Sequence, residues 1–406
     1  MQRLLGPART IFGNRDFTVL LVCNVLVGLA YSFVAPFLSM FGTLEVGMSP
    51  FVFSVFMTTT SIAAIGISTV LARWSDTRYS RRTILAVGGF SGMLGYLGFA
   101  FVRDVVGLTL VGAILLGLAS NTFSQLFAYA RDLLSRSDVP PAQTPLYMNV
   151  FRLFFALSWT VGPAAAAWVM SIWSYVGTFL VAGSLFGVFF LTVLLLVPAV
   201  PPSKKSLEAA AELPLSKAFK NGPLLAHFIG LALFFCCSTL GMMNLPLLIL
   251  NELHGVEWQV GIAYSVAPIF ELPLMLYFGL LASRSDHARL IRFALGLAVV
   301  YYALLSLVGA PWHVYPLQIL SAAIVAVTSG VAITFFQNFL PNQAGTATNV
   351  YSTANRIGAT VGYLLFGALL SAFGHRSVFV ACAGLSLVAS SILYAYRPER
   401  TAPIAA

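Results

Sequence analysis

The sequence predicts an all-α membrane protein in which twelve transmembrane helices form two six-helix halves related by an internal repeat. The first observation behind this prediction is composition, since 59% of the 406 residues are hydrophobic and only 9% are charged. A soluble protein of similar length carries about 25% charged residues, so most side chains here are expected to meet lipid. The other two observations are the number of apolar runs and a motif that occurs twice.

Twelve stretches are long and apolar enough to span a bilayer, whose hydrocarbon core requires about 20 residues of helix. Backbone groups in lipid must hydrogen-bond within their own segment, which makes each stretch a helix. The sixth run ends at Pro198, and a polar connection leads to the seventh. We therefore expect one half at 1–198, a cytoplasmic linker at 199–223 and a second half at 224–406. The twelve runs are 17–41, 50–72, 84–101, 107–130, 146–170, 176–198, 224–250, 258–282, 293–309, 315–339, 348–372 and 377–396.

The repeat is carried by a polar hinge between the second and third runs. Segment 71–76 reads Leu-Ala-x-x-Ser-Asp, and segment 281–286, which lies 210 positions later, has the same pattern. At that offset Pro36 also matches Pro246, and no gap is needed. A repeat of this length in an apolar chain is typical of transporters built from duplicated halves.

The net charge of +9 follows membrane topology and does not indicate nucleic acid. With both termini placed in the cytoplasm, all but four of the 22 Lys and Arg residues fall on that side of the membrane. Arg103 and Arg376 fall outside, and Arg152 and Arg356 lie within spans. This asymmetry is the positive-inside pattern of multi-pass proteins. The expected partner is the lipid bilayer, and no nucleic-acid partner is expected.

The sequence offers no pattern for a cofactor, a metal or an enzymatic site. The four cysteines all lie within apolar runs, where they are expected to act as small buried hydrophobes. Catalysis within the membrane would require paired acids, a histidine–metal cluster or a nucleophile with its base. None of these patterns occurs in the sequence, so we do not expect an enzyme.

Amide side chains within the spans are confined to part of the predicted helices. The third, sixth, ninth and twelfth runs carry no Asn or Gln. This segregation resembles the plan of the major facilitator superfamily, which implies that those four helices support the bundle from outside and that the remaining helices line a central cavity. The amides of the lining helices are Asn24, Asn121, Gln125, Asn149, Asn244, Gln318, Gln337, Asn338, Asn349 and Asn355.

Several polar residues recur at helical spacing and therefore share a face. Asn121, Gln125 and Tyr129 lie four residues apart on the fourth helix, and Arg152 and Trp159 share a face of the fifth. Amides donate and accept hydrogen bonds while aromatic rings cover apolar sugar surfaces, so these rows favour a neutral, hydroxyl-rich ligand. The alternative is that the amides join helices to one another. The predicted substrate-binding residues are Asn24, Tyr31, Asn121, Gln125, Arg152, Trp159, Glu271, Gln337, Asn338 and Asn355.

Glu271 is the acid that lies deep within a predicted span, near the middle of the eighth helix. A buried carboxyl can load and release a proton as access to it changes, which would couple transport to protons. Alternatively it forms a fixed ion pair with Arg152 or Arg356, or it contacts the ligand directly. A charged side chain at this depth costs about 2.5–3.5 kcal/mol on insertion into the membrane. Each of these three interpretations gives a reason why the chain keeps an acid there.

The two hinges resemble the signature of the major facilitator superfamily between helices 2 and 3 and between helices 8 and 9. Ala72 and Tyr79 stand where that signature has glycines. The resemblance implies a gate in which acids at helix ends pair with arginines and release them when the cytoplasmic side opens. The alternative is that these charges only fix topology. The predicted gating residues are Asp76, Arg81, Arg82, Arg131 and Asp286.

Further motifs resemble one branch of that superfamily, the bacterial sugar efflux transporters. They are Gln-Leu-Phe-Ala at 125–128, Gly-Pro at 162–163, Glu-Leu-Pro at 271–273 and Phe-Gln-Asn at 336–338. Members often carry Asp where Asn244 and Asn338 stand here, so this chain lacks two possible proton carriers, and Glu271 is the remaining candidate.

This resemblance implies a multi-pass protein of the bacterial inner membrane, both of whose termini are cytoplasmic. It would act as a monomer and export saccharides or glycosides in exchange for protons, without a cofactor. A multidrug–proton antiporter on the same fold is the alternative function.

Overall fold

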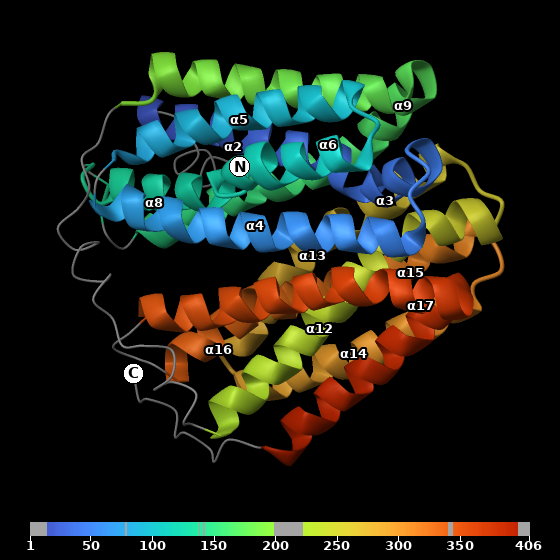
Figure 1. The fold of residues 1–406 in the computed structure, drawn as a ribbon. Helices are drawn as coiled ribbons and strands as arrows, with labels where there is room; N and C mark the ends of the chain where they lie inside the picture. The colour runs from blue at the N-terminus through green and yellow to red at the C-terminus, as the bar shows by residue number, and fades with distance from the viewer. Residues whose placement is uncertain are drawn as a thin grey trace, which may run out of the picture. The chain divides into compact units, whose positions relative to one another are not determined.

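The structure is a computed structural model, and it describes residues 14–77, 79–137, 139–140, 143–198, 222–339 and 344–396. The described residues are helical throughout apart from short turns (Figure 1). Most of the predicted linker 199–223 lies outside the described residues. Ten helices are long and apolar enough to cross a membrane, and the all-α prediction is confirmed for the described part of the chain.

The first half of the chain begins with α2 (Arg15–Val34) and ends with the long helix α9 (Thr144–Leu196). In Figure 1 α5 lies beside α9, and α2 also packs against α9. The intervening elements are η1 (Ala35–Phe37), α3 (Leu38–Met40), η2 (Phe41–Glu45), α4 (Pro50–Thr77), α5 (Arg81–Phe101), α6 (Val105–Leu110), η3 (Val111–Leu116), α7 (Gly117–Ala119) and α8 (Thr122–Leu134).

The second half begins with α12 (Gly222–Leu247) and ends with the long helix α17 (Ala344–Ala395). Here α12 and α14 both pack against α17. The intervening elements are η5 (Leu248–Glu252), α13 (Glu257–Ala282), α14 (His287–Leu307), η6 (Pro311–His313), α15 (Val314–Val325), η7 (Ala326–Val331) and α16 (Ala332–Phe339).

The two longest helices are divided by kinks. At 1.5 Å per residue, the 53 residues of α9 would extend about 80 Å as a straight rod, far more than the bilayer core of about 30 Å. Ser174 has φ 53° within α9, and Gly374 has φ 78° within α17. Left-handed backbone ends a regular helix, so each long helix has two arms.

Polar residues cap the first turns of the helices that follow the two hinges. Ser80 accepts a hydrogen bond from the Thr83 amide at 3.2 Å and caps α5. Asp286 accepts one from the Ala288 amide at 3.0 Å and caps α14. Such caps satisfy amides that have no partner within the helix.

The two halves do not align at the offset of 210 that the motifs predicted. Helices α5 and α14 contain 21 residues each and begin at Arg81 and His287, which is 206 positions apart. Asp286 caps a helix, whereas Asp76 lies in the last turn of α4 and Ser80 provides the cap of α5. The gapless register is therefore wrong at the hinges, because the same motif is used about one turn apart.

Packing divides the chain into two compact units, one built mostly from the first half of the chain and one mostly from the second. Two segments belong to the unit of the opposite half. Ser49–Thr58 from the start of α4 belongs to unit 2, and Val260–Ser265 from α13 belongs to unit 1. Within unit 2 the Gly367 amide donates to Ser54 Oγ at 2.5 Å. Within unit 1 the Ala164 amide donates to Ser265 Oγ at 3.2 Å.

The core of each unit is built from side chains of the sort that the composition predicted. In unit 1 the rings of Phe41, Phe99 and Phe179 meet with centroids 4.7–6.0 Å apart. In unit 2 Cys237 Sγ donates to the Cys382 carbonyl at 3.4 Å. All four cysteines are free and buried, which confirms their prediction as small core residues.

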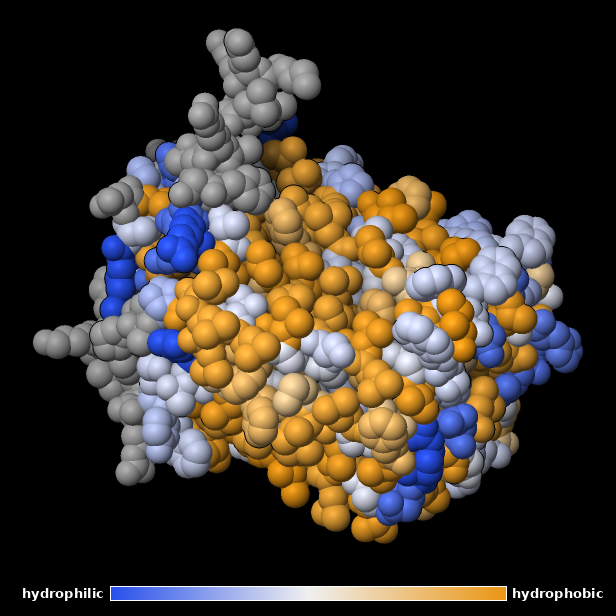
Figure 2. All heavy atoms as spheres, turned by 90° about the horizontal axis from the view of Figure 1, so that it is seen from above, coloured by the Kyte–Doolittle hydropathy of each residue, from blue (hydrophilic) through white to orange (hydrophobic). Residues whose placement is uncertain are grey.

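Large apolar side chains also cover most of the visible surface in Figure 2. Leu195, Leu280 and Leu307 are each more than 70% exposed. A soluble monomer rarely exposes apolar patches beyond a few hundred Å², so this surface is one that lipid covers.

Candidate functional site

The fourth predicted helix is not regular, and the sequence analysis missed this. It consists of α6, the π-helical segment η3, the single turn α7 and then α8, with a turn at Ser120 and Asn121. Such irregularities leave backbone carbonyls without their usual partners and are frequent at functional sites. The hydroxyl of Tyr31 donates to the Ala119 carbonyl at 2.9 Å. Tyr31, a predicted substrate residue, therefore stabilises the break.

The second half contains a similar device. The π-helical segment η7 separates α15 from α16 in the tenth predicted helix. The hydroxyl of Tyr351 donates to the Thr328 carbonyl within η7 at 3.0 Å. In both halves, therefore, a tyrosine from another helix binds a carbonyl of the irregular helix. The nearby sequences Gly117-x-x-Ser120 and Ser329-Gly330 are the signals that could have predicted these breaks.

The polar row of the fourth helix does share a face, but that face is packed within unit 1. Asn121, Gln125 and Tyr129 are all buried. Asn121 Oδ1 accepts from the Ser124 hydroxyl at 2.7 Å, and the Tyr129 hydroxyl donates to the Pro198 carbonyl. In this structure the row consolidates the interior of the unit.

Gln125 is bound to a residue that was predicted to act in the gate. Arg81 Nη1 donates to Gln125 Oε1 at 3.1 Å, and Arg81 Nε lies 2.7 Å from Asp132 Oδ2. The side chains of Arg81 and Asp132 are only 12% and 22% exposed, so water screens this ion pair weakly. A predicted substrate residue and a predicted gating residue thus form one network with Asp132, which the sequence analysis did not select.

Arg82, beside it in the sequence, binds the end of the sixth predicted helix. Its Nε donates to the Val193 carbonyl at 3.3 Å, and its Nη2 donates to the Leu194 carbonyl at 2.6 Å. A cation favours the carbonyl end of a helix because the helix dipole is negative there. Arg82 therefore fixes the end of α9 to the start of α5.

The first and fifth predicted helices approach closely. Asn24 is fully buried, and its Nδ2 donates to the Phe151 carbonyl at 2.6 Å. The Ser32 hydroxyl donates to the Ser158 carbonyl at 3.1 Å, opposite Gly162. A Cβ atom on Gly162 would lie 1.8 Å from Ser32 Oγ. This close contact explains why a residue without Cβ stands at position 162. The Asn24 amide donates to a carbonyl of the neighbouring helix, so Asn24 also joins the two helices.

The remaining predicted substrate residues are accessible within their own units. In unit 1 Arg152 is exposed and Trp159 is half-buried on the first arm of α9. In unit 2 Asn338 and Asn355 are exposed, whereas Gln337 is half-buried and donates from Nε2 to Thr348 Oγ1 at 3.2 Å. Unit 1 thus offers a guanidinium and an indole ring and unit 2 offers amide donors and acceptors, each of which suits a hydroxyl-rich ligand.

Glu271 is half-buried on α13. The ion pairs of the described residues join Arg81 to Asp132, Arg103 to Glu45, Arg292 to Asp286 and Arg376 to Glu252. Within the described part of unit 2, no basic side chain therefore lies within 4.0 Å of the Glu271 carboxylate. A fixed pair with Arg356, one of the alternatives predicted from the sequence, is not formed there.

The predicted gating residues differ in their surroundings. The side chain of Asp76 lies outside the described residues. Arg131 is exposed at the end of α8. Asp286 lies 3.8 Å from Arg292 Nη2 in addition to capping α14. The Arg81–Asp132 network therefore has the closest ion pair among the hinge residues whose side chains are described.

The two arginines assigned to the outer side each pair with a glutamate, which the sequence analysis did not predict. Arg103 Nε lies 3.4 Å from Glu45, and Arg376 Nε lies 2.9 Å from Glu252. Both glutamates end a π-helical segment, η2 in one half and η5 in the other. The two glutamates thus occupy matching positions in the two halves, whereas their partners do not, because Arg103 follows α5 and Arg376 lies in α17.

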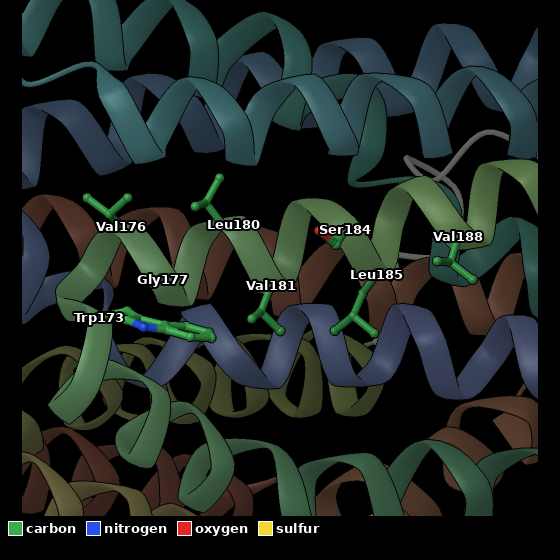
Figure 3. Close-up of a pocket in the computed structure, with 8 residues that line it drawn as sticks. All are labelled: Trp173, Val176, Gly177, Leu180, Val181, Ser184, Leu185 and Val188. Atoms are coloured by element: carbon green, nitrogen blue, oxygen red, sulfur yellow. The ribbon is translucent and has the colours of Figure 1, made fainter.

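A groove of about 740 Å³ runs along the second arm of α9 (Figure 3). Its only hydroxyl belongs to Ser184, and aliphatic side chains and an indole form the rest. This lining suits hydrocarbon better than a saccharide. The lining residues are Trp173, Val176, Gly177, Leu180, Val181, Ser184, Leu185 and Val188.

Residues 20–363 match the model of the Major Facilitator Superfamily. A protein of Deinococcus radiodurans named as a sugar efflux transporter is 33% identical over 385 residues, which cover 93% of this chain and 97% of that protein. The chain belongs to the sugar efflux branch of the major facilitator superfamily. Sugar efflux transporter A of Dickeya chrysanthemi is 30% identical to this chain, and the match covers 93% of this chain and 95% of that protein.

Solved structures agree on the major facilitator fold. The nucleoside transporter NupG superposes with a TM-score of 0.76 at 16% identity, covering 94% of this chain and 100% of that one. A POT family transporter superposes with a TM-score of 0.77 at 14% identity, covering 94% and 96%. The superfamily resemblance drawn from the hinges and short motifs is confirmed, and this membership makes the chain a transporter, not an enzyme.

Proposed function

We propose that this chain exports saccharides or glycosides by alternating access. The observation that carries the proposal is similarity to sugar efflux transporters along nearly the whole of both chains. The relatives cover 93% of the chain, and the superfamily match at residues 20–363 includes the accessible polar residues described above. The chain would act as a monomer in a bacterial inner membrane.

Twelve crossings complete this proposal. The two arms of α9 and of α17 would each cross the membrane once, so that the ten apolar helices provide twelve spans. Both termini would then lie in the cytoplasm, the side to which the positive-inside rule assigns the arginine-rich hinges.

The accessible residues would contact the sugar. Trp159 would cover an apolar face of the ring, while Asn338 and Asn355 would donate to and accept from hydroxyls. Arg152 and Gln337 would add donors. The buried predicted residues would instead hold these helices in place, as their hydrogen bonds to Phe151 O, Ala119 O and Arg81 suggest.

The gate would use the hinge network of unit 1. Arg81 joins Asp132 at the inner end of the fourth helix to Gln125 two turns deeper. Loss of this ion pair would allow the start of α5 and the end of α8 to move apart. Gln125 would then lose its hydrogen bond to Arg81, which would extend the change toward the middle of the fourth helix. Asp76, Arg131 and Asp286 would contribute further pairs in other conformations.

Glu271 would couple export to protons. Its carboxyl has no ionic partner in the described part of unit 2, so it is available to bind a proton. One proton crossing 100 mV supplies about 2.3 kcal/mol, which corresponds to roughly a 50-fold sugar gradient.

Trp159→Ala tests the sugar contact, with Trp168→Ala as the matched control because Trp168 is 66% exposed on the same arm of α9. In counterflow of radiolabelled sugars in proteoliposomes, Trp159→Ala should raise the sugar concentration at half-saturation by roughly five- to ten-fold. An aromatic contact contributes about 1 kcal/mol or somewhat more to binding. Trp168→Ala should behave as the parent. Equal effects in both variants would contradict the sugar contact.

Glu271→Gln tests the proton role by separating two modes of transport. The variant should retain counterflow, which needs no net proton movement, and should lose accumulation driven by a pH gradient. Parent-like accumulation would exclude Glu271 as the carrier.

A multidrug antiporter remains the second candidate because multidrug resistance protein MdtG of Salmonella is 23% identical over 92% of this chain. The similarity is weaker than to the sugar transporters. The same proteoliposomes loaded with lipophilic cations would distinguish the two functions, and cation export without sugar counterflow would favour MdtG-like activity.

A further inference from the structure

Arg292 in α14 is a buried cation with incomplete compensation. The residue is 8% exposed, and its Nη1 has no hydrogen-bond partner among the described residues. Its Nη2 lies 3.8 Å from Asp286, beyond hydrogen-bond distance. Asp286 also caps the helix through Ala288 and is 57% exposed. A buried charge without close partners is costly, so this position calls for an anion.

Comparison with unit 1 shows what is missing. Arg82 contacts the last turn of the sixth helix and has two backbone carbonyls as acceptors. Arg292 likewise contacts the last turn of its half, where its guanidinium lies 5.5 Å from the centroid of the Tyr394 ring. A ring face attracts a cation but accepts no strong hydrogen bond. In the described part of unit 2, the arginine that contacts the last turn of the final helix thus has a ring face where Arg82 has carbonyl acceptors.

The surroundings of Arg292 show where an anion could come from. Arg289, one turn earlier, is exposed, and Tyr394 is 51% exposed. Arginine and interfacial tyrosine together are typical of the level of lipid headgroups. Planar guanidinium groups bind phosphate oxygens with two parallel hydrogen bonds.

The exposed face of α14 continues from Arg289 into a strip of apolar side chains. Phe293, Val300, Leu304 and Leu307 are 40–75% exposed along this face. From Arg289 to Leu307 the helix rises about 27 Å, close to the thickness of a bilayer core. Gly296 leaves open space on the helix, because a Cβ atom there would meet nothing within 4 Å.

We propose that Arg289 and Arg292 bind the phosphate of an anionic phospholipid of the inner leaflet, whose acyl chain lies along the exposed face of α14. A free phosphate ion would satisfy the arginines but would leave the apolar strip unused, so we assign the site to a lipid. Among the described residues, the two arginines outnumber the one carboxylate beside Arg292, that of Asp286, and a net negative headgroup is therefore preferred over a zwitterionic one.

The test is native mass spectrometry of the full-length protein in detergent with phosphatidylglycerol, phosphatidylcholine or inorganic phosphate. The parent should retain phosphatidylglycerol in preference to phosphatidylcholine, and inorganic phosphate at equal concentration should not displace it. Arg289→Gln should weaken phosphatidylglycerol binding about five-fold, the factor that one basic residue contributes near an anionic surface. Arg292→Gln should weaken it at least as much.

Arg284→Gln is the matched control, since Arg284 is an exposed arginine in the turn that precedes α14. It should retain the lipid as the parent does. Because Arg289 is exposed, Arg289→Gln should fold even if Arg292→Gln does not. The lipid binding of Arg289→Gln is therefore sufficient to test the proposal. Equal binding by Arg289→Gln and Arg284→Gln, equal retention of phosphatidylcholine, or displacement by inorganic phosphate would each overturn the proposal.

Discussion

Replacement of Gly162 by alanine should disrupt the contact between the first and fifth helices. The added Cβ would lie 1.8 Å from Ser32 Oγ and 2.8 Å from Ser32 Cβ, where ordinary contacts begin near 3.4 Å. The helices would have to separate by roughly 1.6 Å, or the Ser32 hydroxyl would have to leave the Ser158 carbonyl that it binds at 3.1 Å. Neither movement is free, because Ser32 is fully buried.

The cost follows from two contributions. Overpacking a tight core costs about 1–3 kcal/mol, and a hydrogen bond between membrane helices contributes about 0.6 kcal/mol. We therefore expect Gly162→Ala to lower the free energy of unfolding by about 2–3 kcal/mol, measured as a lower Tm and denaturation midpoint in detergent. Ser32→Gly alone should cost less than this, since it removes the hydrogen bond without adding volume.

The double variant Gly162→Ala/Ser32→Gly provides the control, because it moves the missing Cβ from one helix to the other. Its stability should recover to within about 1 kcal/mol of the parent, which gives a strong coupling energy in the double-mutant cycle. Additive losses, or a single Gly162→Ala variant as stable as the parent, would refute the close-packing argument.

Two further variants test the Arg81–Asp132 ion pair and the contact between Gly367 and the start of α4. Asp132→Asn removes the carboxylate 2.7 Å from Arg81 Nε and should lower the free energy of unfolding by about 1–3 kcal/mol, because the two side chains are only partly buried; thiol-accessibility labelling of the C-terminal end of α8 should rise, and unchanged labelling would contradict a gating role. Gly367→Val should separate α17 from the start of α4, since even a Cβ there would lie 2.4 Å from the Pro50 carbonyl; labelling near Ser54 should increase, and parent-like labelling would argue against this contact.

Much of the fold was predictable because lipid imposes a simple rule on sequence. Any segment of about 20 apolar residues must be a helix in the bilayer, and the apolar runs met this criterion without help from local propensity. The kinks were harder to place. Both kinks nevertheless fall in the short gaps between predicted runs, Ser174 between 170 and 176 and Gly374 between 372 and 377. What the sequence did not indicate is the positive φ of Ser174, which its residue type does not favour.

The site was less predictable because periodicity identifies a face and not what that face meets. The row of Asn121, Gln125 and Tyr129 had the spacing expected of a cavity lining, yet it is buried within unit 1. In contrast, Arg152 and Trp159 on α9 are accessible. Distinguishing the two rows required the positions of neighbouring helices, which depend on contacts between residues far apart in the sequence.

The displaced hinge has a practical consequence for experiments that exchange parts of the two halves. A chimera joined at equal sequence motifs would graft the end of α4 onto a segment that caps α14. It would shift every following side chain by about 6 Å along the helix axis and about 40° around it. Joints placed at helix starts, Arg81 against His287, would preserve which residues face lipid. For the two halves of this chain, equivalent helix starts are thus a better guide to corresponding residues than matching sequence motifs.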